Sequence, residues 1–128
     1  MKNNIPLLRD ITAANSLNID TSNLTNGFSI KHIQLGGTIR LVIVKIISIT
    51  QTNIFTTTTD NVKIAIKWNG TTADVFQNGV KVVTATAFTT TAMQNLFLNG
   101  NDVQKSINST MLFPTPLTDT ECISLTTL

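Results

Sequence analysis

The residues that could do acid–base chemistry in this 128-residue chain are seven carboxylates and a single histidine. Hydrolysis of a glycan by two carboxylates needs an acid and a base or nucleophile close together. Only Asp119 and Glu121 are close in the sequence, and capping of a short helix explains both. We therefore expect that the chain is not an enzyme. The other acidic residues are Asp10, Asp20, Asp60, Asp74 and Asp102.

Metal and thiol chemistry are not expected either. No carboxylate or cysteine stands at metal-ligand spacing from His32, so an ordinary strand histidine is favoured. The lone cysteine, Cys122, has no catalytic partner nearby in the sequence and is interpreted as a partly buried thiol. No cluster of aspartates provides a calcium site. The sequence thus predicts no cofactor and no metal.

Sugar binding remains as a chemical role, since it needs an aromatic platform and planar amides or hydroxyls that hydrogen-bond sugar hydroxyls. Trp68 could supply the aromatic platform. A position in the core or at its rim, on the apolar face of an alternating strand, is the favoured alternative for this residue. Ordinary turn chemistry is likewise favoured for the asparagines. The candidate carbohydrate-binding residues are Trp68, Asn69, Asn99, Asn101 and Asp102.

The elements that would position these residues are strands. Hydrophobic residues make up 41% of the chain and charged residues only 12%, while threonine and asparagine are abundant. Threonine suits a pleated sheet and asparagine suits tight turns. Asn78-Gly79 between two β-rich segments is the strongest short-range hairpin signal. Strands are expected near 17–19, 28–33, 38–49, 54–59, 62–68, 72–77, 80–86, 93–98 and 109–113, with a turn at 50–53 and a closing helix capped by Thr118.

The segment 38–49 is apolar on both of its faces. Such a strand is either covered on both sides or lies at a subunit contact. Residues 1–15 are interpreted as an N-terminal arm, which could pack on a neighbouring subunit. Residues 16–128 then form one domain, since a chain of this length supports a single core.

Charge and hydropathy exclude two classes of partner. The formal net charge is +2, and the basic residues are scattered. Nucleic-acid binding needs a concentrated basic patch, so none is expected. The longest apolar stretch, Leu41 to Ile49, is far too short to cross a bilayer as a helix. The N-terminus also lacks the apolar run of a signal peptide. We expect a soluble protein without membrane insertion.

The order of the motifs resembles concanavalin A-like, laminin-G-like sandwich domains. The alternating segment 63–72, followed by Phe76 and the Asn78-Gly79 turn, resembles the central hairpin of that family. The tail from Met111 to Glu121 is similar to the family's last strand and closing helix. The resemblance covers residues 16–128 and implies an all-β fold: an antiparallel β-sandwich (concanavalin A-like jelly roll) with a short C-terminal helix. The stretch between Ile33 and Val62 is shorter than the family's.

Threonine- and asparagine-rich versions of this domain resemble modules of bacteriophage fibres and other virion surface proteins. The resemblance implies a lectin-like protein on the virion surface that attaches to host surface glycans. The alternative is a purely structural protein of virion assembly or decoration that binds no ligand. Other virion proteins and further copies of the chain, in a dimer or trimer, are the expected partners.

Overall fold

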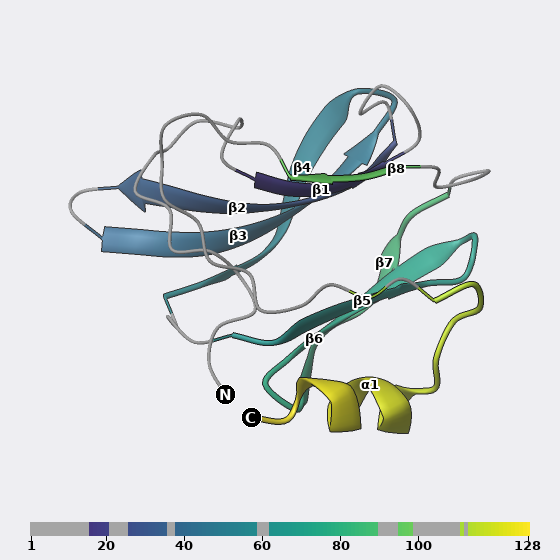
Figure 1. Ribbon diagram of the computed structural model, residues 1–128. Helices are drawn as coiled ribbons and strands as arrows, with labels where there is room; N and C mark the ends of the chain where they lie inside the picture. The colour runs from purple at the N-terminus through teal and green to yellow at the C-terminus, as the bar shows by residue number, and fades with distance from the viewer. Residues whose placement is uncertain are drawn as a thin grey trace.

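Two antiparallel β-sheets form the framework of the protein (Figure 1). The computed structural model describes residues 16–20, 26–35, 38–58, 62–89, 95–98, 111 and 113–128. Its elements are β1 (Ser16–Asp20), β2 (Gly27–Leu35), β3 (Thr38–Ile47), β4 (Thr50–Thr57), β5 (Ile64–Trp68), β6 (Thr72–Gln77), β7 (Val80–Ala87), β8 (Asn95–Leu98) and α1 (Asp119–Thr126). The large sheet has the strand order β4-β3-β2-β1-β8, and the small sheet has the order β5-β6-β7.

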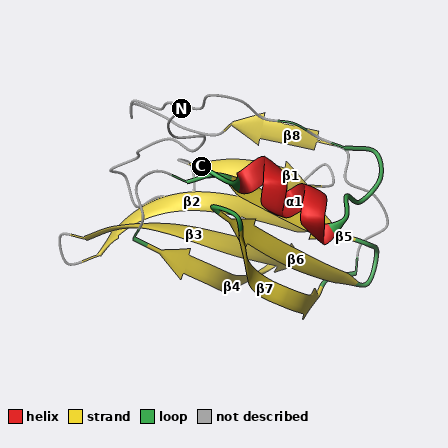
Figure 2. Cartoon of the chain, turned by 90° about the horizontal axis from the view of Figure 1, so that it is seen from below, coloured by secondary structure: helices red, strands yellow, loops and turns green. Residues whose placement is uncertain are grey.

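Each sheet is built largely from strands that follow one another in the chain. Strands β1 to β4 form a meander, β5 to β7 form a second one, and β8 returns to pair with β1. The helix α1 contacts all three strands of the small sheet. Figures 1 and 2 place it on the face of that sheet directed away from the large sheet. The expected antiparallel, mostly β architecture with a short C-terminal helix is confirmed, whereas the predicted arm 1–15 lies outside the described residues.

The two sheets share an apolar core. One buried cluster joins Leu41 and Ile43 of the large sheet to Val75 of the small sheet. A second cluster joins Phe28 of β2 to Phe88, which follows β7. Because apolar side chains from both sheets leave water together, their burial holds the two layers against each other.

Strand β3 is buried on both faces, as its apolar pattern predicts. Leu41 and Ile43 point into the shared core. Val42, Val44 and Ile46 have the opposite parity and form a separate buried cluster, each at most 3% exposed. Of the two alternatives for segment 38–49, the structure therefore shows a strand covered on both sides within one chain.

Two hairpins have two-residue turns, and only one of these turns has a sequence that predicts it. Asn78 and Gly79 both have positive φ, of 49° and 80°, as the Asn-Gly pattern predicts. Ser48 and Ile49 also have positive φ, of 48° and 64°, and join β3 directly to β4. The predicted turn at 50–53 is therefore wrong, because those residues already pair with β3. A β-branched residue at positive φ gives no local signal for such a turn.

The predicted strand at 109–113 is not found where the structure describes that segment. Met111 and Phe113 lie in no strand, and both side chains are exposed. Pro114 and Pro116 follow at once and have no backbone N–H to donate to a sheet. Residues 109, 110 and 112 lie outside the described residues.

The start of α1 confirms the predicted cap. The Thr118 hydroxyl accepts a hydrogen bond from the Glu121 backbone N–H at 3.2 Å, and the Glu121 carboxylate accepts from the Thr118 backbone N–H at 2.8 Å. This reciprocal pair is a capping box, which satisfies two backbone donors that the helix itself leaves unpaired.

We expect Thr118→Ala to lower the free energy of unfolding by about 1 kcal/mol, the usual cost of removing a threonine N-cap. Urea denaturation followed by circular dichroism measures this loss. Thr120→Ala is the control, because Thr120 is exposed two residues further along. Equal losses for the two variants would contradict a capping role.

Candidate functional site

Trp68, the first candidate for sugar binding, lies at the rim of the shared core. It ends β5 and is partly buried. Its ring centroid is 5.7 Å from that of Phe28, with the planes tilted by 43°. Phe28 stacks in turn on Phe88, with centroids 4.3 Å apart. The indole thus continues the aromatic cluster and leaves part of its surface to solvent, so the binding role of Trp68 stays a prediction.

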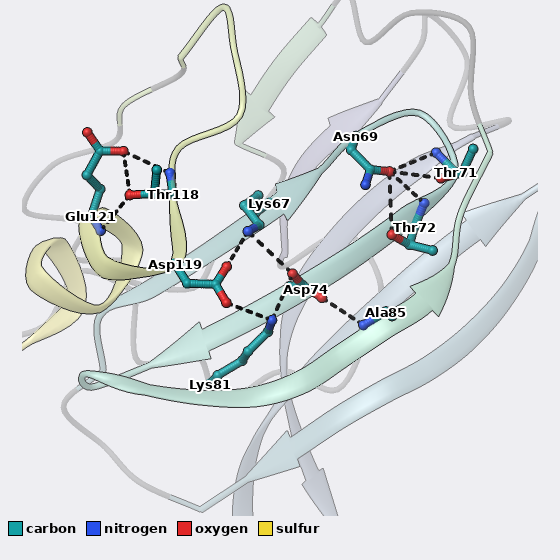
Figure 3. A network of polar contacts seen from close by, with 10 residues as sticks. All are labelled: Lys67, Asn69, Thr71, Thr72, Asp74, Lys81, Ala85, Thr118, Asp119 and Glu121. Carbon is teal, nitrogen blue, oxygen red and sulfur yellow. Dashed lines mark hydrogen bonds and ion pairs between the residues drawn. The ribbon is translucent and has the colours of Figure 1, made fainter.

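Asn69, the second candidate, organises the turn between β5 and β6 (Figure 3). Its side-chain Oδ1 accepts hydrogen bonds from the backbone N–H groups of Thr71 and Thr72, both at 3.0 Å, and from the Thr71 hydroxyl at 3.1 Å. This is the turn chemistry that asparagine commonly performs. The Nδ2 amide group takes no part in these bonds, so its two N–H donors are not used by them.

The other three candidates come from a later part of the chain. Asn99, Asn101 and Asp102 lie outside the described residues. The structure therefore brings together only the neighbours Trp68 and Asn69. The side chain of His32 is also outside the described part of the chain, although its backbone pairs with Leu41 in the large sheet.

A ring of alternating charges, missed by the sequence reasoning, lies between the small sheet and α1 (Figure 3). Lys67 of β5 contacts Asp119 of α1 and lies 3.5 Å from Asp74 of β6. Lys81 of β7 lies 3.1 Å from Asp74 and 3.0 Å from Asp119. Both ammonium groups stand near the ring of buried Phe76, at 5.9 and 5.6 Å from its centroid. We call these two lysines and two aspartates the charged ring.

The charged ring fixes the preferred protonation states of its members. Hydrogen bonding to Asp119 is the main cause that raises the pKa of both Lys67 and Lys81. The same bonds, that of Lys67 first, lower the pKa of Asp119. Partial burial works to raise the pKa of Asp74, but a 2.7 Å hydrogen bond from the Ala85 N–H and the two lysines together outweigh it and lower the pKa. All four groups therefore favour their charged forms.

These shifts predict a pH dependence of stability. The aspartates, with folded pKa values below the ordinary 3.8, stabilise the fold above that pH and lose this contribution as the pH falls through their folded pKa values. The lysines contribute below 10.5 and lose their part as the pH rises through their raised pKa values. Thermal unfolding across pH should therefore show a plateau between these limits.

The variant Asp119→Asn should make the acid side of this profile shallower, because one carboxylate that stabilises only when ionised is gone. Lys63→Gln is the control: it also changes the charge by one, but the Lys63 ammonium group donates to the backbone carbonyl oxygen of Thr127 and is not part of the ring. An unchanged acid side in Asp119→Asn would contradict the role given to the ring.

Helix capping was expected to explain both Asp119 and Glu121, and it is confirmed only for Glu121. Glu121 belongs to the capping box, whose hydrogen bonds from Thr118 lower its pKa. Asp119 sits in the charged ring instead of capping the helix. The sequence around Asp119 could not predict its ion pairs, because Lys67 and Lys81 are 52 and 38 residues away in the chain.

The single cysteine lies in α1. Cys122 is buried and unbonded to another cysteine, and burial is the main cause that raises the pKa of its thiol. Among the residues that the structure describes, no group of three or more potential ligands could hold a metal ion. The described part of the chain also has no helix long and apolar enough to cross a membrane.

No model of a protein family, no curated protein and no solved structure matches this chain.

Proposed function

We propose that this chain is a lectin-type module on the surface of a bacteriophage-like particle, where it attaches the particle to host surface glycans. In this proposal the two sheets belong to a concanavalin A-like jelly roll. The observation that carries it is the small sheet closed by α1. Its Asn78-Gly79 turn and the Thr118–Glu121 cap are the motifs on which the family resemblance rests, and α1 packs on that same sheet.

The proposed sugar site is the rim formed by Trp68 and Asn69. The partly exposed indole offers an apolar face for stacking on a sugar ring. The Nδ2 group of Asn69 offers a donor for a sugar hydroxyl while Oδ1 keeps the turn in place. Asn99, Asn101 and Asp102, which the sequence predicts to lie in one loop, complete the proposed set.

A glycan array followed by isothermal titration tests this proposal. We expect the intact chain to bind a glycan and Asn69→Asp to weaken that binding, because the variant keeps an oxygen for the turn and loses the amide donor. Trp68→Phe should weaken it as well while retaining an aromatic contact with Phe28. A folded protein that binds no glycan at any concentration would overturn the attachment role.

The second candidate function is virion assembly without ligand binding. It is favoured by the contacts of the sugar candidates themselves, since Trp68 packs on core aromatics and Asn69 Oδ1 is used by the turn. On this proposal the module joins other virion proteins and further copies of itself, and it performs no catalysis. Stable oligomers by light scattering together with absent sugar binding would leave the assembly role.

A further inference from the structure

The chain contains several Asn-Gly dipeptides, and each is a chemically possible site of spontaneous deamidation. They are Asn26-Gly27, Asn69-Gly70, Asn78-Gly79 and Asn99-Gly100. In this reaction the backbone nitrogen of the glycine attacks the side-chain carbon of the asparagine before it. Glycine favours the attack because it has no Cβ to crowd the ring that forms. The structure describes the first three dipeptides, and the fourth lies outside the described residues.

Both reacting groups of Asn78-Gly79 are engaged elsewhere in the fold. The backbone N–H of Gly79 donates to Oγ1 of Thr126 at 3.1 Å. The side-chain Oδ1 of Asn78 accepts from the backbone N–H of Lys63 at 2.8 Å. Attack by the Gly79 nitrogen would have to break the first bond and turn the Asn78 amide away from the second. The fold therefore protects this dipeptide.

The Asn26-Gly27 dipeptide is held by the large sheet. Gly27 begins β2 and is paired with β1 on one side and with β3 on the other. The side-chain Oδ1 of Asn26 accepts from the backbone N–H of Ser48 at 2.9 Å. Turning the Gly27 nitrogen toward Asn26 would distort a strand that is paired on both sides, so the fold protects this dipeptide as well.

The Asn69-Gly70 dipeptide lacks this protection. Asn69 is exposed, and Gly70 has a φ of 96° with no atom within 4 Å of the position of an added Cβ. In the part of the chain that the structure describes, the backbone N–H of Gly70 donates to no atom. Among the three described dipeptides, this is therefore the one whose attacking nitrogen is available.

The hydrogen bonds that hold the Asn69 side chain also prepare it for the attack (Figure 3). Its Oδ1 accepts from the backbone N–H groups of Thr71 and Thr72 and from the Thr71 hydroxyl. Attack on Cγ moves negative charge onto this same oxygen. Donors that already point at an oxygen on which charge develops lower the barrier of a reaction. The Nδ2 group, which has to leave, is not held by these bonds.

We propose that Asn69 is a site of self-catalysed deamidation, to which the fold directs the reaction in preference to Asn26 and Asn78. A base from solvent takes the proton of the Gly70 N–H, and the nitrogen lone pair forms a bond to Cγ of Asn69. The bond from Cγ to Nδ2 breaks, and this nitrogen takes up a proton and leaves as ammonia. The product is a cyclic succinimide. Water then adds at Cγ to give aspartate, or at the backbone carbonyl carbon to give isoaspartate.

The reaction removes the amide donor that is proposed to bind a sugar hydroxyl. This consequence rests on the proposed function, whereas the chemistry at Asn69 does not depend on it. Formation of aspartate makes the same change as Asn69→Asp, and isoaspartate also lengthens the backbone of the turn. The module would thus lose its glycan binding with time and without the action of another enzyme.

Peptide mass spectrometry of the intact chain, incubated at mildly alkaline pH and then digested at low pH, tests the site. The readout is the mass gain from exchange of an amide nitrogen for oxygen. In the folded chain we expect Asn69 to react at least about tenfold faster than Asn78. The hydrogen bond of Gly79 alone accounts for a factor up to this size. In urea the two rates should become similar. Equal rates in the folded chain, or the same preference in urea, would overturn the proposal.

The variant Thr71→Val tests the self-catalysis, because it removes the hydroxyl donor to Oδ1 and keeps the backbone N–H. We expect the reaction at Asn69 to slow severalfold. This is less than the ~10²-fold cost of losing one donor in a buried active site, because the turn is exposed to water. Thr120→Val, at an exposed position of α1, is the control and should leave the rate unchanged. An unchanged or faster reaction in Thr71→Val would overturn the assistance by these donors.

The protection of Asn78 is tested at Thr126. Thr126→Val removes the hydroxyl that accepts from Gly79 and should speed the reaction at Asn78, whereas the matched control Thr126→Ser keeps the hydroxyl and the slow rate. An unchanged rate in folded Thr126→Val would contradict the protection. The comparison in the unmodified chain needs no substitution, so it holds even if a variant does not fold.

Glycan binding by fresh and aged protein separates this proposal from the attachment role. If fresh protein binds a glycan, its loss on ageing should follow the mass gain at Asn69, and binding that survives complete conversion would contradict the consequence drawn for the sugar site. If fresh protein binds no glycan, the attachment role fails, and preferential reaction at Asn69 still supports the site of deamidation.

Discussion

Replacing Phe76 by alanine should lower the free energy of unfolding by about 3–5 kcal/mol, the usual cost of deleting a fully buried phenylalanine side chain. Phe76 has no exposed surface and lies on the face of β6 opposite to Val75, which fills the core between the sheets. Its ring is therefore under α1 rather than in the shared core. Since whole domains are stable by only about 5–15 kcal/mol, this variant should be close to unfolding at room temperature.

Two components of this loss can be separated. Phe76→Leu keeps most of the buried apolar volume but removes the aromatic face near the ammonium groups of Lys67 and Lys81. Phe76→Leu should therefore lose less stability than Phe76→Ala. Its loss has two parts: about 0.5–1 kcal/mol for each cation–π contact that is removed, and the cost of repacking leucine in place of phenylalanine. Urea denaturation monitored by circular dichroism gives both values.

The matched control for Phe76 is Phe113→Ala. Phe113 is 43% exposed and lies outside every strand, so its removal should change stability by no more than about 0.5 kcal/mol. If Phe76→Ala and Phe113→Ala were equally mild, α1 could not be packed on the small sheet as described.

Local sequence patterns predicted the parts of the fold that depend on neighbours in the chain. Alternation predicted β5, Asn78-Gly79 predicted a turn with two positive φ angles, and Thr118 with Glu121 predicted the helix cap. Each of these signals involves residues within a few positions of one another. The physical causes of these signals act between residues that are close in the sequence. They are the alternation of side chains along a strand, the backbone freedom of turn residues and the hydrogen bonds of the helix cap.

The features that were missed depend on long-range contacts or contradict local preference. The turn at Ser48 and Ile49 has a backbone that asparagine and glycine would favour, so the sequence indicated a longer strand and a later turn. Nothing near Lys67 or Lys81 in the sequence indicated that Asp119 would close a ring of charges with them.

For the candidate sugar site, the sequence predicted which residue types could bind a sugar but not the contacts that these residues make. The sequence alone shows that an aromatic residue, Trp68, directly precedes an asparagine, Asn69. That Oδ1 of Asn69 would hold the turn, and that Trp68 would reach Phe28 in the other sheet, follows from the packing of the two layers. Alternation places a side chain on a face but does not say what packs there.

Gly79→Ala should be the second strongly destabilising substitution, with a loss of about 2–4 kcal/mol from left-handed backbone strain and overpacking together. Gly79 has a φ of 80°, and an added Cβ would lie 2.9 Å from Oγ1 of Thr127. The backbone N–H of Gly79 also donates to Oγ1 of Thr126 at 3.1 Å. The hairpin therefore approaches the end of α1 so closely that an added methyl group would meet the Thr127 hydroxyl, which would have to move.

Gly70→Ala separates the two contributions. Gly70 has a φ of 96°, but no atom lies within 4 Å of the position of its added Cβ. This variant carries the backbone strain without the steric clash, so its loss should be about 1–2 kcal/mol. A difference between the two glycine variants measures the close approach of hairpin and helix.

The double variant Gly79→Ala/Thr127→Ala tests that approach directly, because it removes the oxygen that the new methyl group would meet. Residues in contact couple by about 0.5–3 kcal/mol, so the double variant should be more stable than the sum of its two single losses implies. Additive losses would mean that α1 does not end against the Asn78-Gly79 turn. The sequence signal for this hairpin would then describe an isolated turn and not the point at which the helix is anchored to the small sheet.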